Sequence, residues 1–517
     1  MPRTLVIIGC LLLSSCLVGP RYKEPLKPAA RSWKKDNAVV KTARSQNAHW
    51  WDVFHDPTLT ALIHQGYQNN LTLQSAAVRV LQARAQLAQS VGGLFPQQQA
   101  LIANYTYNRI GGSSLQTVLP SNFKTALLGF SANWEIDFWG KYRRAILAND
   151  AAFLASFAAY DNALVTLIAD IATTYINIRT TEELIIVTKQ NIEVQKTGYK
   201  IATSRYEAGE TSLLDVQQAK TELYQTEARL PQFVNNLQKQ KDALAVLLGT
   251  TPDQIDCLLV KKKGIPKAQA KIAVNIPKET LIQRPDIYQA RMEAIAQSEL
   301  IGATKANLFP SFSLAGSFAF AANTIGGQSI SDLFNWSNRN ITAGPAVNWP
   351  LLNYGQITNA VRVQDAVYQQ SVLNYINVVL KAQQEVQDNI TQFIEAKNAT
   401  RLLTIANNSA IKSTKLSLTR YREGESDYTP VLDSQRQQLQ VQLSLIDAKG
   451  DIPKALVALY RSLGGGWQLH GCNDIVPPGI KKDMAARTNW GTLLKQQKHE
   501  PARTIAQRTK ERYLPTW

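Results

Sequence analysis

The side chains best suited to metal binding or nucleophilic catalysis are few and scattered in this 517-residue chain. Its five histidines stand at positions 49, 55, 64, 470 and 499, and none has a partner at the spacing of metal ligands. The sequence contains no Walker phosphate loop and no nucleophile elbow. We therefore expect a protein that is not an enzyme and that needs no cofactor or metal.

Cys16 is the thiol whose chemistry is best defined. It ends the string Leu13-Ser14-Ser15-Cys16, after a short basic and then apolar segment that begins at Arg3. This arrangement resembles a signal peptide with a bacterial lipobox, in which residues 1–15 are removed and the cysteine is lipidated. The alternative is an ordinary secretory signal with an incidental cysteine.

Two further cysteines, Cys257 and Cys472, lie 215 residues apart. Because a secreted chain enters a compartment that permits disulfides, these thiols could form a bridge, or both could stay unpaired. Their spacing alone does not decide between the two alternatives.

The same spacing of 215 residues recurs along the chain. Arg205-Tyr206 and Gly209-Glu210 reappear as Arg420-Tyr421 and Gly424-Glu425. A period this long is not that of a short solenoid repeat. We expect two similar halves with pseudo-twofold symmetry, each containing a helical hairpin that turns at Gly209 or at Gly424.

Four segments alternate apolar and polar residues with a period of two, which predicts β-strands with one apolar and one polar face. Each has about ten residues, the length that crosses a bilayer when the strand is tilted. Four strands cannot close a barrel, and an open sheet edge is not tolerated in hydrocarbon, so we expect several chains to share one barrel. The expected strands cover about 98–108, 124–136, 311–322 and 340–351.

Most of the remaining sequence has helical periodicity. From Tyr142 to Glu207 the chain has no proline, and the second half predicts an equivalent helix from about Asn353 to Arg422. Each would be a rod on the order of 100 Å long. We expect a kink at Pro231 in the returning helix of the first half. Beyond the signal segment we find no uninterrupted run of about twenty apolar residues, so we expect no transmembrane helix.

The formal net charge of the chain is +17. Dispersed Lys and Arg residues indicate a solvated surface rather than a nucleic-acid groove, so we expect no nucleic-acid partner. Residues 481–517 differ, because they hold nine Lys and Arg against Asp483, Glu500 and Glu511. Their composition predicts a flexible basic tail.

Five strings, in order along the mature chain, carry a family signature. They are Val18-Gly19-Pro20-Arg21-Tyr22, Trp50-Trp51-Asp52-Val53-Phe54-His55-Asp56-Pro57, Trp134-Glu135-Ile136-Asp137-Phe138-Trp139-Gly140-Lys141, Arg284-Pro285-Asp286-Ile287 and Leu463-Gly464-Gly465-Gly466-Trp467. Together they resemble the outer membrane efflux protein family, in its lipoprotein, NodT-like branch related to TolC. The resemblance extends to about residue 479.

This resemblance implies a homotrimer in the outer membrane. Four strands from each chain would form a twelve-stranded β-barrel surrounded by lipid, and a long periplasmic α-helical coiled-coil barrel would continue it. Such a duct docks onto a periplasmic adaptor protein and a proton-driven inner-membrane pump. It passively conducts drugs or other small toxic compounds to the exterior.

The residue patterns and the resemblance together divide the chain into seven segments. We expect a signal peptide at 1–15, a lipidated N-terminal arm at 16–48, repeat 1 at 49–249, an equatorial linker at 250–276, repeat 2 at 277–464, an equatorial segment at 465–480 and the tail at 481–517.

By the same resemblance, Asp215 and Tyr421 match members of the network that holds the periplasmic tip closed, and Asp433 matches an aspartate that forms a ring in the pore. This chain departs from the TolC pattern at Pro430 and Ser426, where that pattern has an aspartate and an arginine. Asp427 could supply the missing ring, or it could cap the helix that follows Gly424. A ring of carboxylates at a constriction would favour cations.

Two other functions compete with small-molecule efflux. A duct for type I protein secretion would have the same fold, but the lipobox and the Arg284-Pro285-Asp286 string favour efflux. A structural coiled-coil lipoprotein is less favoured, because a rod has no use for strands with an apolar face of bilayer length.

Overall fold

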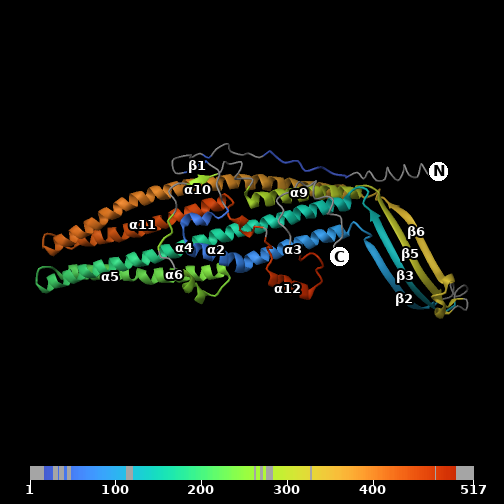
Figure 1. Ribbon diagram of the computed structural model, residues 1–517, viewed down its shortest axis with the longest axis horizontal. Helices are drawn as coiled ribbons and strands as arrows, with labels where there is room; N and C mark the ends of the chain where they lie inside the picture. Colours follow the sequence, from blue (N-terminus) through green and yellow to red (C-terminus); the bar gives the residue numbers. More distant parts are fainter. Residues whose placement is uncertain are drawn as a thin grey trace.

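A computed structural model of the chain describes residues 17–26, 33, 40–42, 48–111, 120–260, 264–267, 272–274, 283–325, 329–471 and 473–495. The molecule is elongated, with a sheet at one end, the turns of two helical hairpins at the other, and shorter helices packed around the middle (Figure 1). The predicted signal peptide, Cys16 and Cys472 lie outside the described residues.

Four strands form one antiparallel sheet at the end of the molecule. Its order is β2-β3-β5-β6, and its strands are β2 (Gln98–Arg109), β3 (Asn122–Ile136), β5 (Ser311–Asn323) and β6 (Arg339–Asn348). All four correspond to segments in which the sequence alternates with a period of two. A separate parallel pair joins β1 (Val40–Thr42) to β4 (Ile272–Val274).

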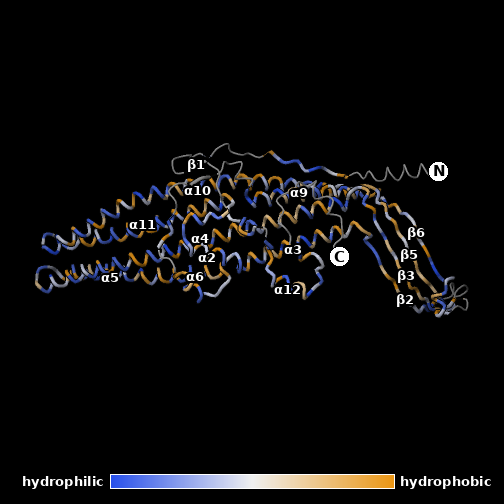
Figure 2. The backbone as a smooth tube through the Cα atoms, in the orientation of Figure 1, coloured by the Kyte–Doolittle hydropathy of each residue, from blue (hydrophilic) through white to orange (hydrophobic). Residues whose placement is uncertain are grey.

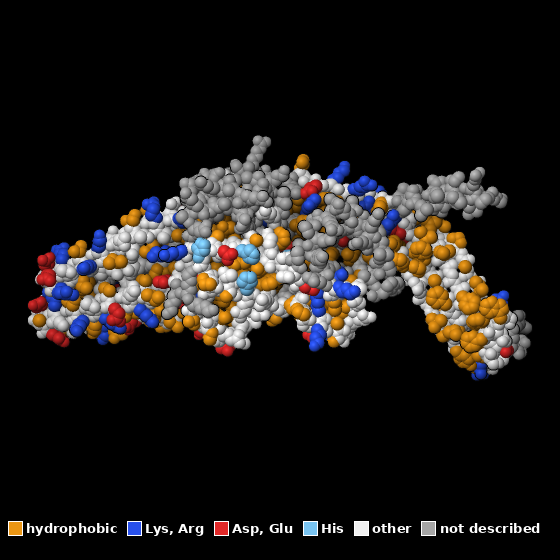
Figure 3. Space-filling view, viewed as in Figure 1, with side chains coloured by type: hydrophobic (Ala, Val, Ile, Leu, Met, Phe, Trp, Pro, Cys, Tyr) orange, Lys and Arg blue, Asp and Glu red, His pale blue; other side chains and the backbone are white. Residues whose placement is uncertain are grey.

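The register of this sheet separates apolar from polar side chains. Residues directly opposite one another in neighbouring strands point to the same face. One row across the sheet is apolar and consists of Leu101, Phe130, Phe318 and Ile341. The adjacent row, on the opposite face, consists of Ala100, Ser131, Ser317 and Thr342. Figure 3 shows hydrophobic side chains gathered over the strands.

Two helices of 67 residues each, α4 (Lys141–Glu207) and α10 (Gln356–Arg422), run most of the length of the molecule. At 1.5 Å per residue, each is about 100 Å long. The chain returns from α4 through α5 (Leu213–Glu227) and α6 (Arg229–Leu248), and from α10 through α11 (Thr429–Ser462).

The break between α5 and α6 lies close to the predicted kink at Pro231. A proline ring clashes with the carbonyl group four residues earlier in a helix. For Pro231 that residue is Glu227, the last residue of α5. The interruption therefore falls at Ala228 rather than at the proline itself.

By length and composition alone, one helix of the described residues, α4, could span a membrane, although the sequence predicts no transmembrane helix. The helix contains an 18-residue window that passes this test of length and composition, but 56% of that window is buried inside the fold. Leu164, Ile168, Ile171 and Tyr175 of α4 belong to the main hydrophobic core. Apolar and polar residues are interspersed along both long helices (Figure 2). We interpret the apolar part of α4 as a core helix.

The main core lies at the middle of the molecule, where α2 (Pro57–Asn69) and α3 (Leu71–Gly92) pack on α4. Trp50 and Trp51 are fully buried there, and the Trp50 ring stacks on Tyr460 of α11 with centroids 5.5 Å apart. From the second repeat, α9 (Pro285–Lys305) lies between α4 and α10. Helix α9 begins at the Arg284-Pro285 string.

The prediction of a flexible tail from residue 481 onward is wrong for residues 481–495. Helix α12 (Pro478–Arg487) extends into this segment, and Met484 belongs to the main core. Trp490 and Leu494 also pack against that core. These apolar contacts hold the segment in place although its average composition is basic. Residues 496–517 lie outside the described residues.

Candidate functional site

The tips of the two helical hairpins have the same backbone geometry. Gly209 follows α4 with a φ of +79°, and Gly424 follows α10 with a φ of +82°, a conformation that glycine adopts without strain. The N–H groups of Glu210 and Glu425 donate to the carbonyl groups of Arg205 and Arg420, each at 2.9 Å. These are the bonds of a Schellman motif, which ends a helix at a glycine. Both long helices therefore end at the glycines where the sequence predicts turns.

The surroundings of the two tips differ. Tyr421 is 1% exposed, whereas its equivalent Tyr206 is 43% exposed. The Tyr421 hydroxyl donates a hydrogen bond to Oδ2 of Asp215 over 3.3 Å, and the Thr211 hydroxyl donates to the same oxygen. The structure thus brings together two residues that the sequence assigns to the closing network. We call the contact between Asp215 and Tyr421 the latch.

Arg205 encloses the latch from the side of α4. Its guanidinium lies 4.8 Å from the centroid of the Tyr421 ring and donates a hydrogen bond to the Tyr421 carbonyl. Tyr428 packs edge-on against Tyr421, with ring centroids 5.0 Å apart. Burial, and then the carboxylate of Asp215, raise the pKa of the Tyr421 hydroxyl, so this hydroxyl remains a donor at neutral pH.

A second link joins the same two hairpins further from the turns. Nε of Arg436 on α11 lies 2.6 Å from a carboxylate oxygen of Glu222 on α5. Glu222 is buried and Arg436 is half exposed. Removing one partner of such a pair leaves the buried charge uncompensated, so this ion pair adds to the attachment between the hairpins.

Asp427 and Asp433 are not part of the latch. Both are exposed, and neither carboxylate forms a hydrogen bond or ion pair with the described residues. The N-cap of α11 is Tyr428, so the alternative role of Asp427 as the helix cap does not hold.

Sequence reasoning did not identify four residues that support the latch: Arg205, Thr211, Glu222 and Arg436. Arg205 had a visible signal, because it stands in the repeated Arg-Tyr pair. Glu222 and Arg436 had none, since their pairing depends on the relative placement of α5 and α11.

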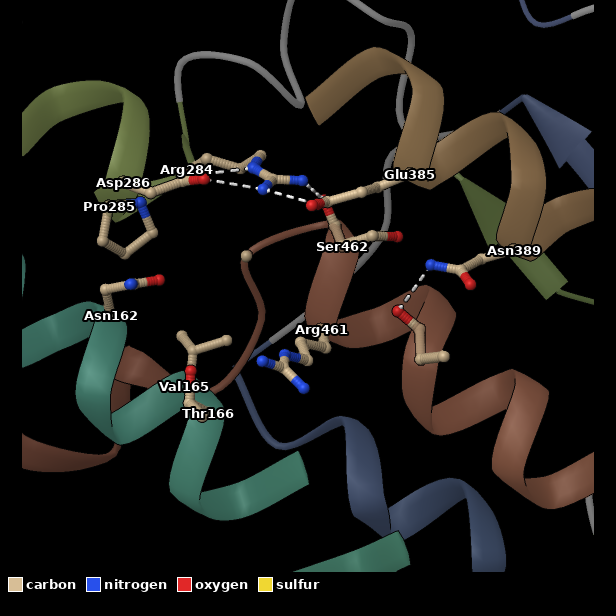
Figure 4. A pocket seen from close by; sticks show the side chains of 12 residues that line it. Asn162, Val165, Thr166, Arg284, Pro285, Asp286, Glu385, Asn389, Arg461 and Ser462 are labelled. Atoms are coloured by element: carbon tan, nitrogen blue, oxygen red, sulfur yellow. Dashed lines mark hydrogen bonds and ion pairs between the residues drawn. The ribbon is translucent and has the colours of Figure 1, made fainter. Parts of the chain in front are cut away.

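The polar cavity at the middle of the molecule has a volume of about 380 Å³ and contains the Arg284-Pro285-Asp286 string (Figure 4). The buried Arg284 guanidinium donates to Asp286, to Glu385 of α10 and to the carbonyl of Ser462 at the end of α11. These bonds tie the start of α9 to two other helices. The string therefore stabilises the fold.

Cys257 lies on the short helix α7 (Ile255–Leu259) and is exposed. Because Cys472 is outside the described residues, a bridge between them stays a prediction. Within the part of the chain that the structure describes, no group of three or more His, Cys, Asp or Glu side chains could hold a metal ion.

Comparison with known proteins identifies the family of this chain. A model of the outer membrane efflux protein family matches residues 62–250 and 276–465. The chain belongs to the outer membrane efflux protein family. The two matched segments overlap the two repeats that the sequence predicts.

Individual members of the outer membrane efflux protein family match over most of their length. Nodulation protein T of Rhizobium leguminosarum bv. trifolii is 27% identical over 457 residues, which cover 88% of this chain and 96% of the relative. The cation efflux system protein CusC of Escherichia coli O6:H1 is 26% identical over 464 residues, covering 89% and 97%. The solved structure of the outer-membrane channel OprN superposes with a TM-score of 0.80 at 27% identity, covering 88% of this chain and all of OprN.

Proposed function

We propose that this protein is the outer-membrane exit duct of a tripartite efflux pump, anchored by lipid at Cys16. It passively conducts drugs or other small toxic compounds from a periplasmic adaptor and a proton-driven inner-membrane pump to the exterior. The similarity to efflux channels supports the general role. The sheet and the hairpin tips support the finer details.

The main observation that supports this proposal is that the sheet has two open edges. Within the described residues, β2 and β6 each pair along one side only. A sheet edge in hydrocarbon leaves backbone N–H and C=O groups without partners, so the edges must be closed by further strands. Three copies of the four-stranded sheet would give a closed barrel of twelve strands, apolar outside and polar inside.

Tryptophans mark one boundary of the apolar band. Trp134 and Trp349 occupy equivalent positions in the two repeats and are 36% and 53% exposed. Their Nε1 groups donate to the carbonyls of Leu94 and Leu308, each over 3.1 Å. Tryptophan is enriched at membrane–water interfaces, so we place the periplasmic surface of the outer membrane here.

The hairpin tips supply the gate. The latch and the ion pair between Glu222 and Arg436 hold the two hairpins of one chain together. Asp427 and Asp433 are exposed near the same tips. Three copies of each carboxylate would form acidic rings, which favour the passage of cations.

A matched pair of substitutions in β3 tests the proposed duct. Phe130→Lys puts a charge on the apolar face, at a cost of about 2–4 kcal/mol per copy near the bilayer midplane, whereas Ser131→Lys places the same charge on the polar face. We expect only the first to abolish assembled trimers, measured by native mass spectrometry, and efflux of a fluorescent dye by the complete pump. Equal tolerance of both variants would contradict the assignment of faces. If the wild-type protein forms normal trimers but deleting its gene leaves dye export unchanged, the result would favour a role in protein secretion.

A further inference from the structure

The first residues of the mature chain lie in a narrow site where β3 meets α4. The N–H group of Val18 donates to the carbonyl of Trp139 over 3.2 Å. Leu17 lies against Gly140, so that a Cβ atom added to that glycine would be 3.1 Å from a Leu17 methyl carbon. In Figure 1 the described N-terminal segment lies beside the helices, with its first residues at the end nearer the sheet.

Arg144 binds this segment through its backbone. The guanidinium donates from Nε to the carbonyl of Val18 over 3.2 Å and from Nη2 to the carbonyl of Gly19 over 3.3 Å. Nη1 forms an ion pair with Glu299 of α9. Arg144 is 4% exposed, so its charge is buried. Glu299 of the second repeat balances this charge, while Arg144 itself, in the first repeat, holds the N-terminal segment by charge-assisted hydrogen bonds.

Glycines make room for the close approach. A Cβ atom on Gly302 of α9 would stand 2.6 Å from the Val18 carbonyl oxygen and 2.8 Å from Nε of Arg144. Gly19 has a φ of +106°, and a Cβ atom there would stand 2.4 Å from the Cα atom of Gly302. Since both separations are shorter than real contacts, only glycine fits at these two positions without a shift of the backbone.

Within the described residues the site occurs once, although the architecture is duplicated. By the offset of 215 residues, Gly140 and Arg144 correspond to Gly355 and Asn359. Gly355 has nearly the same φ as Gly140, but the Asn359 side chain is the one group of the described chain near its Cβ position. The chain has one N-terminus, and one of the two junctions is built to receive it.

We propose that the anchor notch, formed by Gly140, Arg144, Glu299 and Gly302, is the binding site for the acylated N-terminus. It holds residues 17–19 where β3 meets α4 and so limits how far from this junction a lipid on Cys16 can reach. Cys16 directly precedes Leu17 in the sequence. The contacts that hold Leu17 in the notch therefore limit how far the acyl chains on Cys16 can move from it. The part of this inference that concerns lipid rests on the proposed lipidation of Cys16.

Limited trypsin digestion of the lipidated protein in vesicles tests the notch. Arg21 is exposed, and beyond it Glu24 is fixed by an ion pair with Arg291. Cleavage at Arg21 therefore requires residues 17–19 to leave the notch. We expect Gly302→Ala to accelerate release of the N-terminal peptide about tenfold, because its Cβ atom displaces the Val18 carbonyl. Gly92→Ala is the matched control, since a Cβ atom there meets nothing within 4 Å.

Cleavage of Gly302→Ala at the wild-type rate would overturn the proposal. If Gly302→Ala does not assemble, the double variant Arg144→Gln/Glu299→Gln removes the contacts that hold residues 17–19 without leaving a buried charge. Slow cleavage of that double variant would overturn the proposal equally.

A Cys16→Ser variant separates the effect of the notch from that of the lipid. This variant should remain protected from trypsin, whereas rapid cleavage would show that the acyl chains alone hold the N-terminus. Absence of fatty acid on wild-type Cys16 would refute the lipidation, but the cleavage rates, followed by mass spectrometry, would still test the notch.

Discussion

The two hairpin tips have the same backbone geometry but differ in the side-chain contacts around it. Each ends its long helix with the same glycine turn and the same Arg–Glu pair, at 3.4 Å in both repeats. Yet Tyr421 is buried against Asp215, whereas Tyr206 is exposed. By the repeat offset, the position equivalent to Asp215 is Pro430, which has no side-chain acceptor. Duplication therefore supplied two similar scaffolds, and the chemistry of a latch is present on one of them.

This difference predicts where a trimer would be weakest. Within one chain, the second hairpin is attached to the first by the latch and by the ion pair between Glu222 and Arg436. At the equivalent boundary between copies, Tyr206 would meet Pro430 instead of an aspartate. We expect the contacts between chains at the tips to open before the contacts within a chain.

The largest effect should come from truncating the two equivalent tyrosines. Tyr421→Ala removes a fully buried aromatic ring, so we expect the free energy of unfolding to fall by about 3–5 kcal/mol. Tyr206→Ala, at the exposed equivalent, should change it by less than about 0.5 kcal/mol. Thermal unfolding followed by circular dichroism measures both. Similar losses would mean that the two tips are equally covered.

The next comparison is between the ion pair that joins the two hairpins and the exposed pair within the second tip. Arg436→Ala leaves the buried Glu222 carboxylate without its partner, and we expect a loss of about 2 kcal/mol. Arg420→Ala breaks an exposed pair with Glu425 and should cost less than about 1 kcal/mol. Adding Glu222→Gln to Arg436→Ala should restore part of the loss. No recovery in that double variant would show that Arg436 acts through packing rather than charge.

A smaller effect should separate the two glycines that begin the long helices. Gly140 and Gly355 have φ values of +79° and +82°, so alanine is strained similarly at both. Only Gly140→Ala also presses on Leu17, and we expect it to cost about 1 kcal/mol more than Gly355→Ala. Denaturant unfolding of both variants measures the difference. Equal costs would argue that Leu17 does not pack tightly on the junction.

The smallest effect concerns pH. The pKa of Tyr421 is raised by burial and by Asp215 above its ordinary value of 10.0. Since the folded protein binds this proton more tightly than the unfolded chain does, the contribution of Tyr421 is fully present below pH 10 and is lost as the pH rises through the raised pKa. We expect wild-type stability to fall more steeply above pH 10 than that of Tyr421→Phe. Parallel pH curves would show that this hydroxyl does not titrate with unfolding.

Much of the fold could be predicted from patterns that are local in sequence. Alternation with a period of two located the four strands, and the long stretch from Tyr142 to Glu207 without proline located α4. The repeated glycines located the turns. Each pattern depends on backbone preferences within a few residues, so no knowledge of packing was needed.

The features that sequence reasoning missed depend on distant contacts. The pairing of Glu222 with Arg436 and the grip of Arg144 on the N-terminus join residues that no periodicity relates. The order of residues 481–495 was missed for the same reason, because Trp490 and Leu494 gain their partners only when the main core exists. Resemblance to a known family singled out Asp215 and Tyr421, and the structure shows that they are in contact and which residues surround them.

Single-channel conductance of the purified lipidated protein in a planar bilayer tests the central claim most directly. We would compare the wild type with the double variant Asp215→Ala/Tyr421→Phe, using Tyr206→Phe as the control on the equivalent tip. A hydrogen bond to a charged group contributes about 1.5 kcal/mol or more, so its loss should raise the ratio of open to closed tips about tenfold. The account predicts small, cation-preferring openings in the wild type and in Tyr206→Phe, and larger, longer ones in the double variant. Unchanged conductance in the double variant would contradict the latch, and no conductance from folded trimers would contradict the duct itself.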